Sequence, residues 1–109
     1  VTNLLIITQN HREIWSELYA RPELSRVLDE HVDLERQSIT QDEKLFVRFL
    51  VLHLSGAHRA IQQDMFMSPE GLACDVRTFF ALPIPRELWK KLRPTQDVDF
   101  VRFVEACTC

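Results

Sequence analysis

Glycine is scarce in this sequence, with only two among 109 residues, and apolar and polar residues rarely alternate as they do in an exposed strand. Glycine-rich loops that bind phosphate groups can hardly be built from so few glycines. The sequence also has no paired-carboxylate pattern and no recognisable nucleophile motif. We therefore expect an all-α protein that is not an enzyme and uses no cofactor or metal.

Cysteine and basic charge are limited too. Three cysteines, an odd number, in a chain with a full-sized core are typical of a reduced intracellular protein. The net charge of −3 removes the electrostatic reason to expect nucleic-acid binding. The first ten residues resemble neither a signal peptide nor a membrane span, so we expect a cytoplasmic protein. A start at Val1 is compatible with loss of an initiator methionine or with excision from a longer chain.

The most hydrophobic part of the chain is residues 40–64, which contain no proline. Thr40 followed three positions later by Glu43 is the pattern of a capping box and predicts a helix start. Between Leu45 and Leu54 only two residues are polar, so the pattern predicts a helix that is apolar all round and lies at the centre of the fold. Small residues around Gly56 predict that another helix crosses closely there.

Five amphipathic segments are expected to surround this helix. The first covers residues 3–20, and a second, shorter one follows Pro22; residues 33–39 are a connection between it and the central helix. Later helices are predicted after Ser68, over residues 86–92, and after Thr95 as the cap of the last one. The sequence thus predicts one domain, residues 1–109, an all-α bundle of about six helices around residues 40–64. The expected inward residues are Leu24, Val27, Leu28 and His31, then Leu72, Val76, Phe79 and Phe80, then Leu88, Trp89 and Leu92, and finally Phe100, Phe103, Val104 and Cys107.

Three polar residues of the central helix are candidates for a site. Arg48 must either pair with an acid or extend its charged head to the surface, because an unpaired buried charge is very unfavourable. We favour a structural ion pair, with an anion-binding site as the alternative. His53 and His58 are five positions apart and point about 140° apart around a helix, which argues against a shared metal and favours hydrogen-bonded core residues.

Two further groups have alternative interpretations. Arg86, Lys90, Lys91 and Arg93 form a basic cluster, interpreted as a solvated face or as a contact with an anionic surface such as a membrane. Cys107 and Cys109 are a weak candidate for metal chelation, and a frayed chain end is the favoured interpretation. For Cys74 we expect a packing role, because it shares a face of small residues with Thr78 and Ala81.

Most of the chain is also similar to a group of uncharacterised bacterial proteins. The similarity lies in IWSELYARPELSRVL, in the apolar central helix, and in the closing segment SPEGLACDVRTFFALPIPRELWKKLRPTQDVDFVRFVEA. In that group a small helical cytoplasmic domain follows one or two transmembrane helices, which are missing from this sequence. The resemblance implies a domain near the membrane, and the group offers no established activity.

Together these observations favour a non-enzymatic interaction or regulatory module. It would act through an unknown protein partner or through self-association, close to the membrane if the resemblance holds. The alternative is a domain that binds a small ligand or an anion, or hydrolyses one, with Arg48, His53 and His58 near a pocket.

Overall fold

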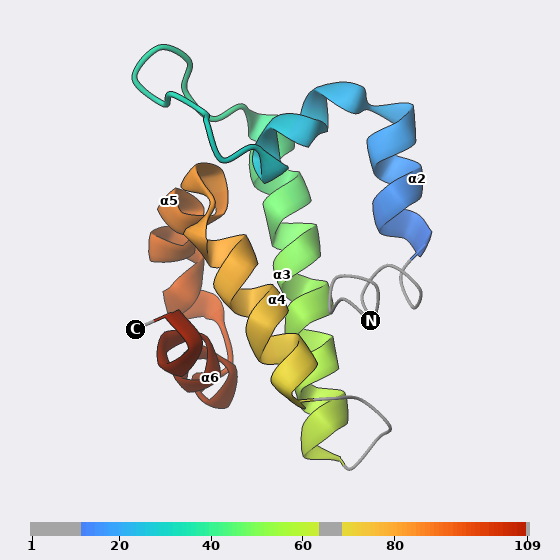
Figure 1. Ribbon diagram of the computed structural model, residues 1–109, viewed down its shortest axis with the longest axis vertical. Coiled ribbons are helices and arrows are strands. Elements are labelled where there is room, and N and C mark those ends of the chain that lie inside the picture. Colours follow the sequence, from blue (N-terminus) through green and yellow to red (C-terminus); the bar gives the residue numbers. More distant parts are fainter. Residues whose placement is uncertain (1–11, 64–68, 109) are drawn as a thin grey trace.

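The computed structural model describes residues 12–63 and 69–108, with side chains from residue 16 onward. Within these ranges every regular element is a helix, and the elements pack into one bundle (Figure 1). The predicted all-α bundle is therefore confirmed. Its elements in chain order are α2 (Arg12–Ala20), the 3-10 helix η1 (Pro22–Leu28), α3 (Gln41–Gln62), α4 (Pro69–Ala81), α5 (Pro83–Leu92), the 3-10 helix η2 (Arg93–Thr95) and α6 (Val98–Thr108).

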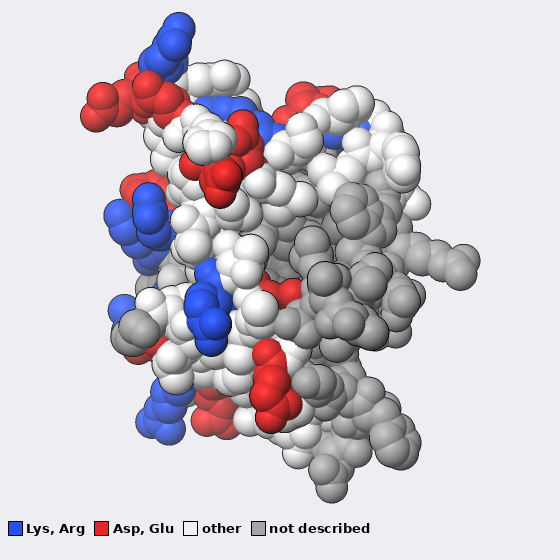
Figure 2. Space-filling view, viewed as in Figure 1, with Lys and Arg blue, Asp and Glu red and all other residues white. Residues whose placement is uncertain are grey.

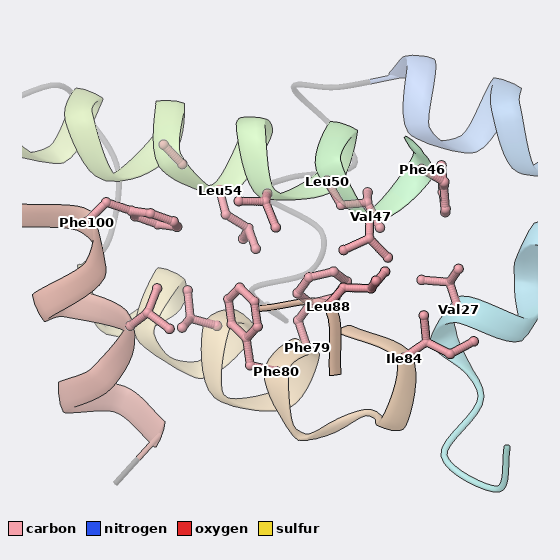
Figure 3. Packing of buried hydrophobic residues seen from close by; sticks show 14 of the residues in the cluster. Val27, Phe46, Val47, Leu50, Leu54, Phe79, Phe80, Ile84, Leu88 and Phe100 are labelled. Atoms are coloured by element: carbon pink, nitrogen blue, oxygen red, sulfur yellow. The ribbon is translucent and has the colours of Figure 1, made fainter. Parts of the chain in front are cut away.

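Helix α3 is the central element, as predicted, and it begins with the predicted capping box. The Thr40 hydroxyl accepts a hydrogen bond from the Glu43 backbone N–H at 3.1 Å, and the Glu43 carboxylate accepts one from the Thr40 N–H at 2.9 Å. Elements η1, α4, α5 and α6 all contact α3. Figure 3 shows apolar side chains of α3 pointing toward those of η1, α4, α5 and α6. The buried apolar residues of α3 are Phe46, Val47, Leu50, Val51, Leu54 and Ala57.

The prediction that α3 is apolar and covered on every side is wrong. Leu45 is 50% exposed and Leu52 is 68% exposed, although both belong to the apolar run. They lie on one stripe of the helix with four other exposed residues, because positions separated by three or four share a helical face. The neighbouring helices cover the remaining faces of α3 and leave this stripe open. The other exposed members of the stripe are Gln41, Arg48, Gly56 and Arg59.

Gly56 lies on the same stripe, and the predicted close helix crossing does not exist there. The residue is exposed, and a Cβ atom built on it would meet no other atom within 4 Å. The adjacent Ala57 is buried instead. The small side chain at position 56 therefore faces open space and does not make room for a second backbone.

Prolines begin most of the shorter helices. Pro22 and Pro69 are the first residues of η1 and α4, and Pro83 begins α5 three positions before the predicted start at Arg86. Proline suits a first helical position because its fixed φ is already helical and its missing N–H needs no partner. The earlier start of α5 places Ile84 in the core, fully buried. Residues 3–11 and Ser68, where two helix starts were predicted, lie outside the described residues.

The inward faces of the later helices agree with the sequence pattern. Helix α4 lies against α6, α5 and α3, and the aromatic rings of these helices touch one another. For example, the centroid of the Trp89 ring lies 4.8 Å from that of Phe80 and 6.0 Å from that of Phe100. The predicted residues of α4, α5 and α6 are all buried or half-buried: Leu72, Val76, Phe79, Phe80, Leu88, Trp89, Leu92, Phe100, Phe103, Val104 and Cys107.

Two helix ends differ from the prediction. Leu24 and Val27 of η1 are buried, but Leu28 is exposed, because with three residues per turn a 3-10 helix aligns positions i and i+3 and turns position i+4 away. His31 is exposed in the turn beyond the end of η1. The last helix is capped by Asp97 and not by Thr95. The Asp97 carboxylate accepts a hydrogen bond from the Phe100 N–H at 3.2 Å, whereas the Thr95 hydroxyl donates to the Leu92 carbonyl.

Candidate functional site

The exposed stripe of α3 forms one wall of an open trough, whose other wall is the C-terminal part of α5 together with η2. Two depressions make up this trough, with volumes of about 730 Å³ and 160 Å³. They share Leu45, Arg48 and Leu92, so they are continuous. We call this surface the α3–α5 trough, and its lining residues are Gln41, Lys44, Leu45, Arg48, Phe49, Leu52, Leu88, Lys91, Leu92, Thr95 and Gln96.

The floor of the trough is apolar. Leu45 and Leu52 are exposed, while Phe49 and Leu92 are half-buried and extend the apolar surface toward the core. The ring of Phe49 packs against the rings of Phe46 and His53, with centroid distances of 6.4 Å and 4.4 Å. Single exposed leucines are ordinary, but leucines that line one concavity with half-buried neighbours form a contiguous apolar patch.

The rim of the trough carries only positive charge. Lys44, Arg48 and Lys91 line it, and no Asp or Glu is among the lining residues. None of these three cations forms an ion pair within the described part of the chain. This asymmetry is notable in a protein whose net charge is −3.

The face of the molecule shown in Figure 2 has a different character. There, acidic and basic side chains alternate, and neither sign covers a continuous area. A mixed charged surface of this kind favours solubility and indicates no particular partner.

Arg48 has no ion pair with any described residue, although the sequence favoured a structural ion pair for it. Its side chain is exposed, and within residues 12–63 and 69–108 no carboxylate lies within 4.0 Å of its guanidinium. The charged head of Arg48 therefore extends to the surface, as arginine side chains on apolar helices commonly do. This places Arg48 on the wall of the trough.

The structure does not bring His53 and His58 to Arg48. His53 is half-buried and packs edge-on against Phe49, and His58 is buried between Phe100 at 5.8 Å and Phe103 at 4.6 Å. Neither histidine lines the trough. Burial lowers the pKa of His58, and the carboxylates of Asp97 and Asp99 partly oppose that shift. His58 is therefore a core residue of the α3–α6 contact.

One buried carboxyl group was not anticipated from the sequence. Asp75 of α4 is 6% exposed, and its Oδ2 atom has no hydrogen-bond partner within the part of the chain described here. Burial raises its pKa to about 6, with no charged group contributing to the shift. Asp75 does not line the α3–α5 trough. A carboxyl group in an apolar interior is strongly disfavoured in its ionised form, which links Asp75 to stability.

The four residues of the basic cluster on α5 and η2 differ in whether they form an ion pair. Lys90 pairs with Glu87 at 3.0 Å, and Arg93 pairs with Glu105 of α6 at 2.6 Å. Arg86 and Lys91 are exposed without an ion pair to any described residue, and only Lys91 lines the trough. The four residues therefore differ in their ion pairing, and their contact with an anionic surface stays a prediction.

The cysteines and acids provide no metal site among the described residues. Cys74 is exposed, so the expected packing role is wrong; the small-residue face of α4 that carries it points to solvent. Cys107 is half-buried, and burial raises the pKa of its thiol. Cys109 lies outside the described residues. No described helix combines the length and the apolar character needed to cross a bilayer.

Comparison with models of known protein families, with curated proteins and with solved structures finds no match to this chain. Support for a function therefore comes from the shape, charge and exposed leucines of the trough.

Among the residues of the trough, the sequence pattern indicated Arg48 as a candidate but did not indicate Lys44, Leu45 or Leu52. A usable signal was present: the polar or small residues of the central segment recur at the spacing of one helical face, and Leu45 and Leu52 fall among them. That spacing marks the solvent side of the helix. The members of this face are Gln41, Leu45, Arg48, Leu52, Gly56 and Arg59.

Proposed function

We propose that this protein is a non-enzymatic interaction module that binds a partner protein through the α3–α5 trough. The observation that supports the proposal is the pair of exposed leucines, Leu45 and Leu52, in a concavity whose floor continues into half-buried Phe49 and Leu92. Exposed apolar surface of this kind reduces solubility, and a protein that keeps it in a concave region commonly uses it for binding.

The shape of the trough favours a macromolecular partner over a small molecule. Sites for small ligands bury most of the ligand surface in a closed cleft. The trough is open, and the exposure of Leu52 shows that its floor lies near the solvent. A partner that contributes its own apolar side chains can cover such a floor, whereas a small metabolite would remain largely in water.

The alternative of a small-ligand or anion site built from Arg48, His53 and His58 is less well supported. The three side chains lie in different environments, and each histidine packs against a phenylalanine. The location near a membrane that the sequence resemblance implies stays a prediction, as does cytoplasmic localisation.

A displayed library of amphipathic helical peptides, varied in charge and in apolar spacing, tests the proposal. Peptides selected against the wild-type protein should lose at least about tenfold in affinity for a Leu45→Ser, Leu52→Ser double variant, since central apolar contacts carry most of the energy of such interfaces. Tyr19→Ser is the matched control, because Tyr19 is an exposed large side chain of α2 outside the trough. Selected peptides that bind the double variant as tightly as the wild type would refute the trough as the binding surface.

A further inference from the structure

From its charge and dimensions we infer that the α3–α5 trough binds an acidic amphipathic helix. This inference rests on the proposed function and adds the chemical class of the partner. Its first support is charge complementarity. Lys44, Arg48 and Lys91 stand along the rim without an acidic neighbour among the lining residues. A partner with carboxylates beside its apolar face would supply the missing counter-charges.

What distinguishes these cations is their position around one concavity, since five basic residues outside the trough also have no ion pair among the described residues. Arg21, Arg26, Lys90 and Arg93 each have a carboxylate partner within the chain. The three cations of the trough have none among the described residues and converge on one apolar floor. Complementary charges at the edge of an interface raise the association rate and select among partners more than they add affinity.

The dimensions of the trough fit a helix. It follows α3 from Gln41 to Leu52, which corresponds to about 16 Å, or about three helical turns, at 1.5 Å per residue. A helix of that length presents apolar side chains at positions i, i+3 or i+4, and i+7 on one face. Those side chains would contact Leu45, Leu52 and Leu92, and flanking Asp or Glu residues would face the rim.

The concave form also argues against a membrane as the occupant. A lipid surface is flat on this scale and would contact the edges of the trough before its floor. In addition, Lys90 and Arg93, which would extend a basic surface around α5, are already engaged by Glu87 and Glu105. The basic residues free to attract anionic lipid are thus fewer than the sequence cluster suggested.

Three synthetic helical peptides of about 15 residues provide the test, with one shared leucine face and with flanking residues that are Glu, Gln or Lys. The wild-type protein should bind the Glu peptide about tenfold or more tighter than the Gln peptide, and the Lys peptide should bind most weakly. Fluorescence anisotropy measures each Kd. The preference for the Glu peptide should shrink at high salt, because ions screen exposed charges.

Single variants identify the residues responsible. Lys44→Gln, Arg48→Gln and Lys91→Gln should each weaken the Glu peptide by roughly two- to fivefold and leave the Gln peptide unchanged, as expected for exposed charge pairs. Lys90→Gln is the matched control, since Lys90 is adjacent to Lys91 but is paired with Glu87 and lies outside the trough. Circular dichroism verifies that each variant is folded.

The outcomes separate the two proposals. If no peptide binds, the proposed function fails with the inference. If the Gln or Lys peptide binds as tightly as the Glu peptide and Leu52→Ser abolishes binding, the trough is an interaction surface but the acidic partner is wrong. Salt-sensitive binding to phosphatidylserine vesicles that is lost in Arg48→Gln, without binding of the Glu peptide, would identify a membrane as the occupant. Concentration-dependent self-association abolished by Leu52→Ser would identify a second copy of this chain.

Discussion

Arg26 and Glu43, 17 positions apart, form an ion pair in which Arg26 Nη1 lies 2.7 Å from Glu43 Oε1. The side chain of Glu43 is 4% exposed, and the same carboxylate oxygen accepts the Thr40 N–H of the capping box. Arg26 also donates hydrogen bonds to the carbonyl groups of Gln37 and Ser38. One guanidinium therefore connects η1, the end of the connection between η1 and α3, and the first turn of α3.

Because Glu43 is buried and has two roles, its removal should be strongly destabilising. We expect Glu43→Ala to lower the free energy of unfolding by about 3 kcal/mol, since it removes the carboxylate half of the capping box and leaves the Arg26 charge without its partner. Glu43→Gln keeps an acceptor for the Thr40 N–H and should lower it less, by about 1–2 kcal/mol. Urea denaturation followed by circular dichroism gives both values.

The exposed pair Lys90 and Glu87 is the matched control for that measurement. Glu87→Gln should change the free energy of unfolding by no more than about 0.5 kcal/mol, because exposed ion pairs contribute little. If Glu43→Ala and Glu87→Gln had equal effects, the connection through Arg26 would have no structural importance.

Gly56 provides a stabilising substitution. It lies within α3 on the solvent stripe, and a Cβ atom there has open space around it. Gly56→Ala should therefore raise the free energy of unfolding by about 1 kcal/mol through helix propensity alone, which corresponds to an increase of about 4 °C in Tm. Calorimetry measures the shift. Destabilisation by Gly56→Ala would instead support the close helix crossing that the sequence suggested.

The fold class and most of the core could be predicted because hydrophobic spacing and proline positions are local signals. The capping box of Thr40 and Glu43 identified the start of α3, and the stripe of Leu72, Val76 and Phe79 identified the inward face of α4. These signals lie within one turn or two of a helix. They depend on the same periodicity that packing requires.

The errors arose where a distant segment decides the outcome. The partner of Glu43 is in η1, and no local pattern identifies Arg26 as that partner. The exposure of Leu52 depends on how α5 lies against α3. No local sequence pattern reveals that arrangement. The residues of the trough were consequently predicted to be buried. Arg48 was predicted to form an internal ion pair, which it does not form with any described residue.

Asp75 should make stability depend on pH. Its folded pKa is about 6, above the value near 3.9 of an unfolded chain, so the folded state binds the proton more tightly. Its contribution to stability is present in full below about pH 4 and is lost as the pH rises through about 6. We expect Asp75→Asn to raise the free energy of unfolding by about 2 kcal/mol near pH 8 and to have little effect near pH 4.

Urea denaturation of the wild type and of Asp75→Asn across this pH range tests the point. Glu35→Gln, a change of an exposed side chain in the turn before α3, is the control and should change the free energy of unfolding by no more than about 0.5 kcal/mol. A constant difference between Asp75→Asn and the wild type at all pH values would show that Asp75 does not titrate in this range.

His58 should act in the opposite direction. Burial lowers its pKa below the value near 6.5 of an unfolded chain, so the unfolded state binds the proton more tightly. Its contribution to stability is present above about pH 6.5 and is lost as the pH falls toward the folded pKa. The non-titrating variant His58→Leu should therefore lose less stability than the wild type on acidification.

An NMR titration of the His58 ring provides an independent measurement. Asp99→Asn should lower the pKa of His58 further, because the Asp99 carboxylate opposes the effect of burial. A His58 pKa above the value near 6.5 of an unfolded chain would contradict the burial of His58 between Phe100 and Phe103.

Leu52 and Leu54 are two positions apart on α3, but loss of their side chains should affect stability to very different extents. Leu54 is 3% exposed, and Leu54→Ala should lower the free energy of unfolding by about 3 kcal/mol through the cavity it leaves. Leu52 is 68% exposed, so Leu52→Ser should change it by less than about 1 kcal/mol. Urea denaturation of the two variants gives the comparison. A large loss in Leu52→Ser would mean that this leucine serves the fold; near-neutral stability with loss of peptide binding would mean that it serves a partner.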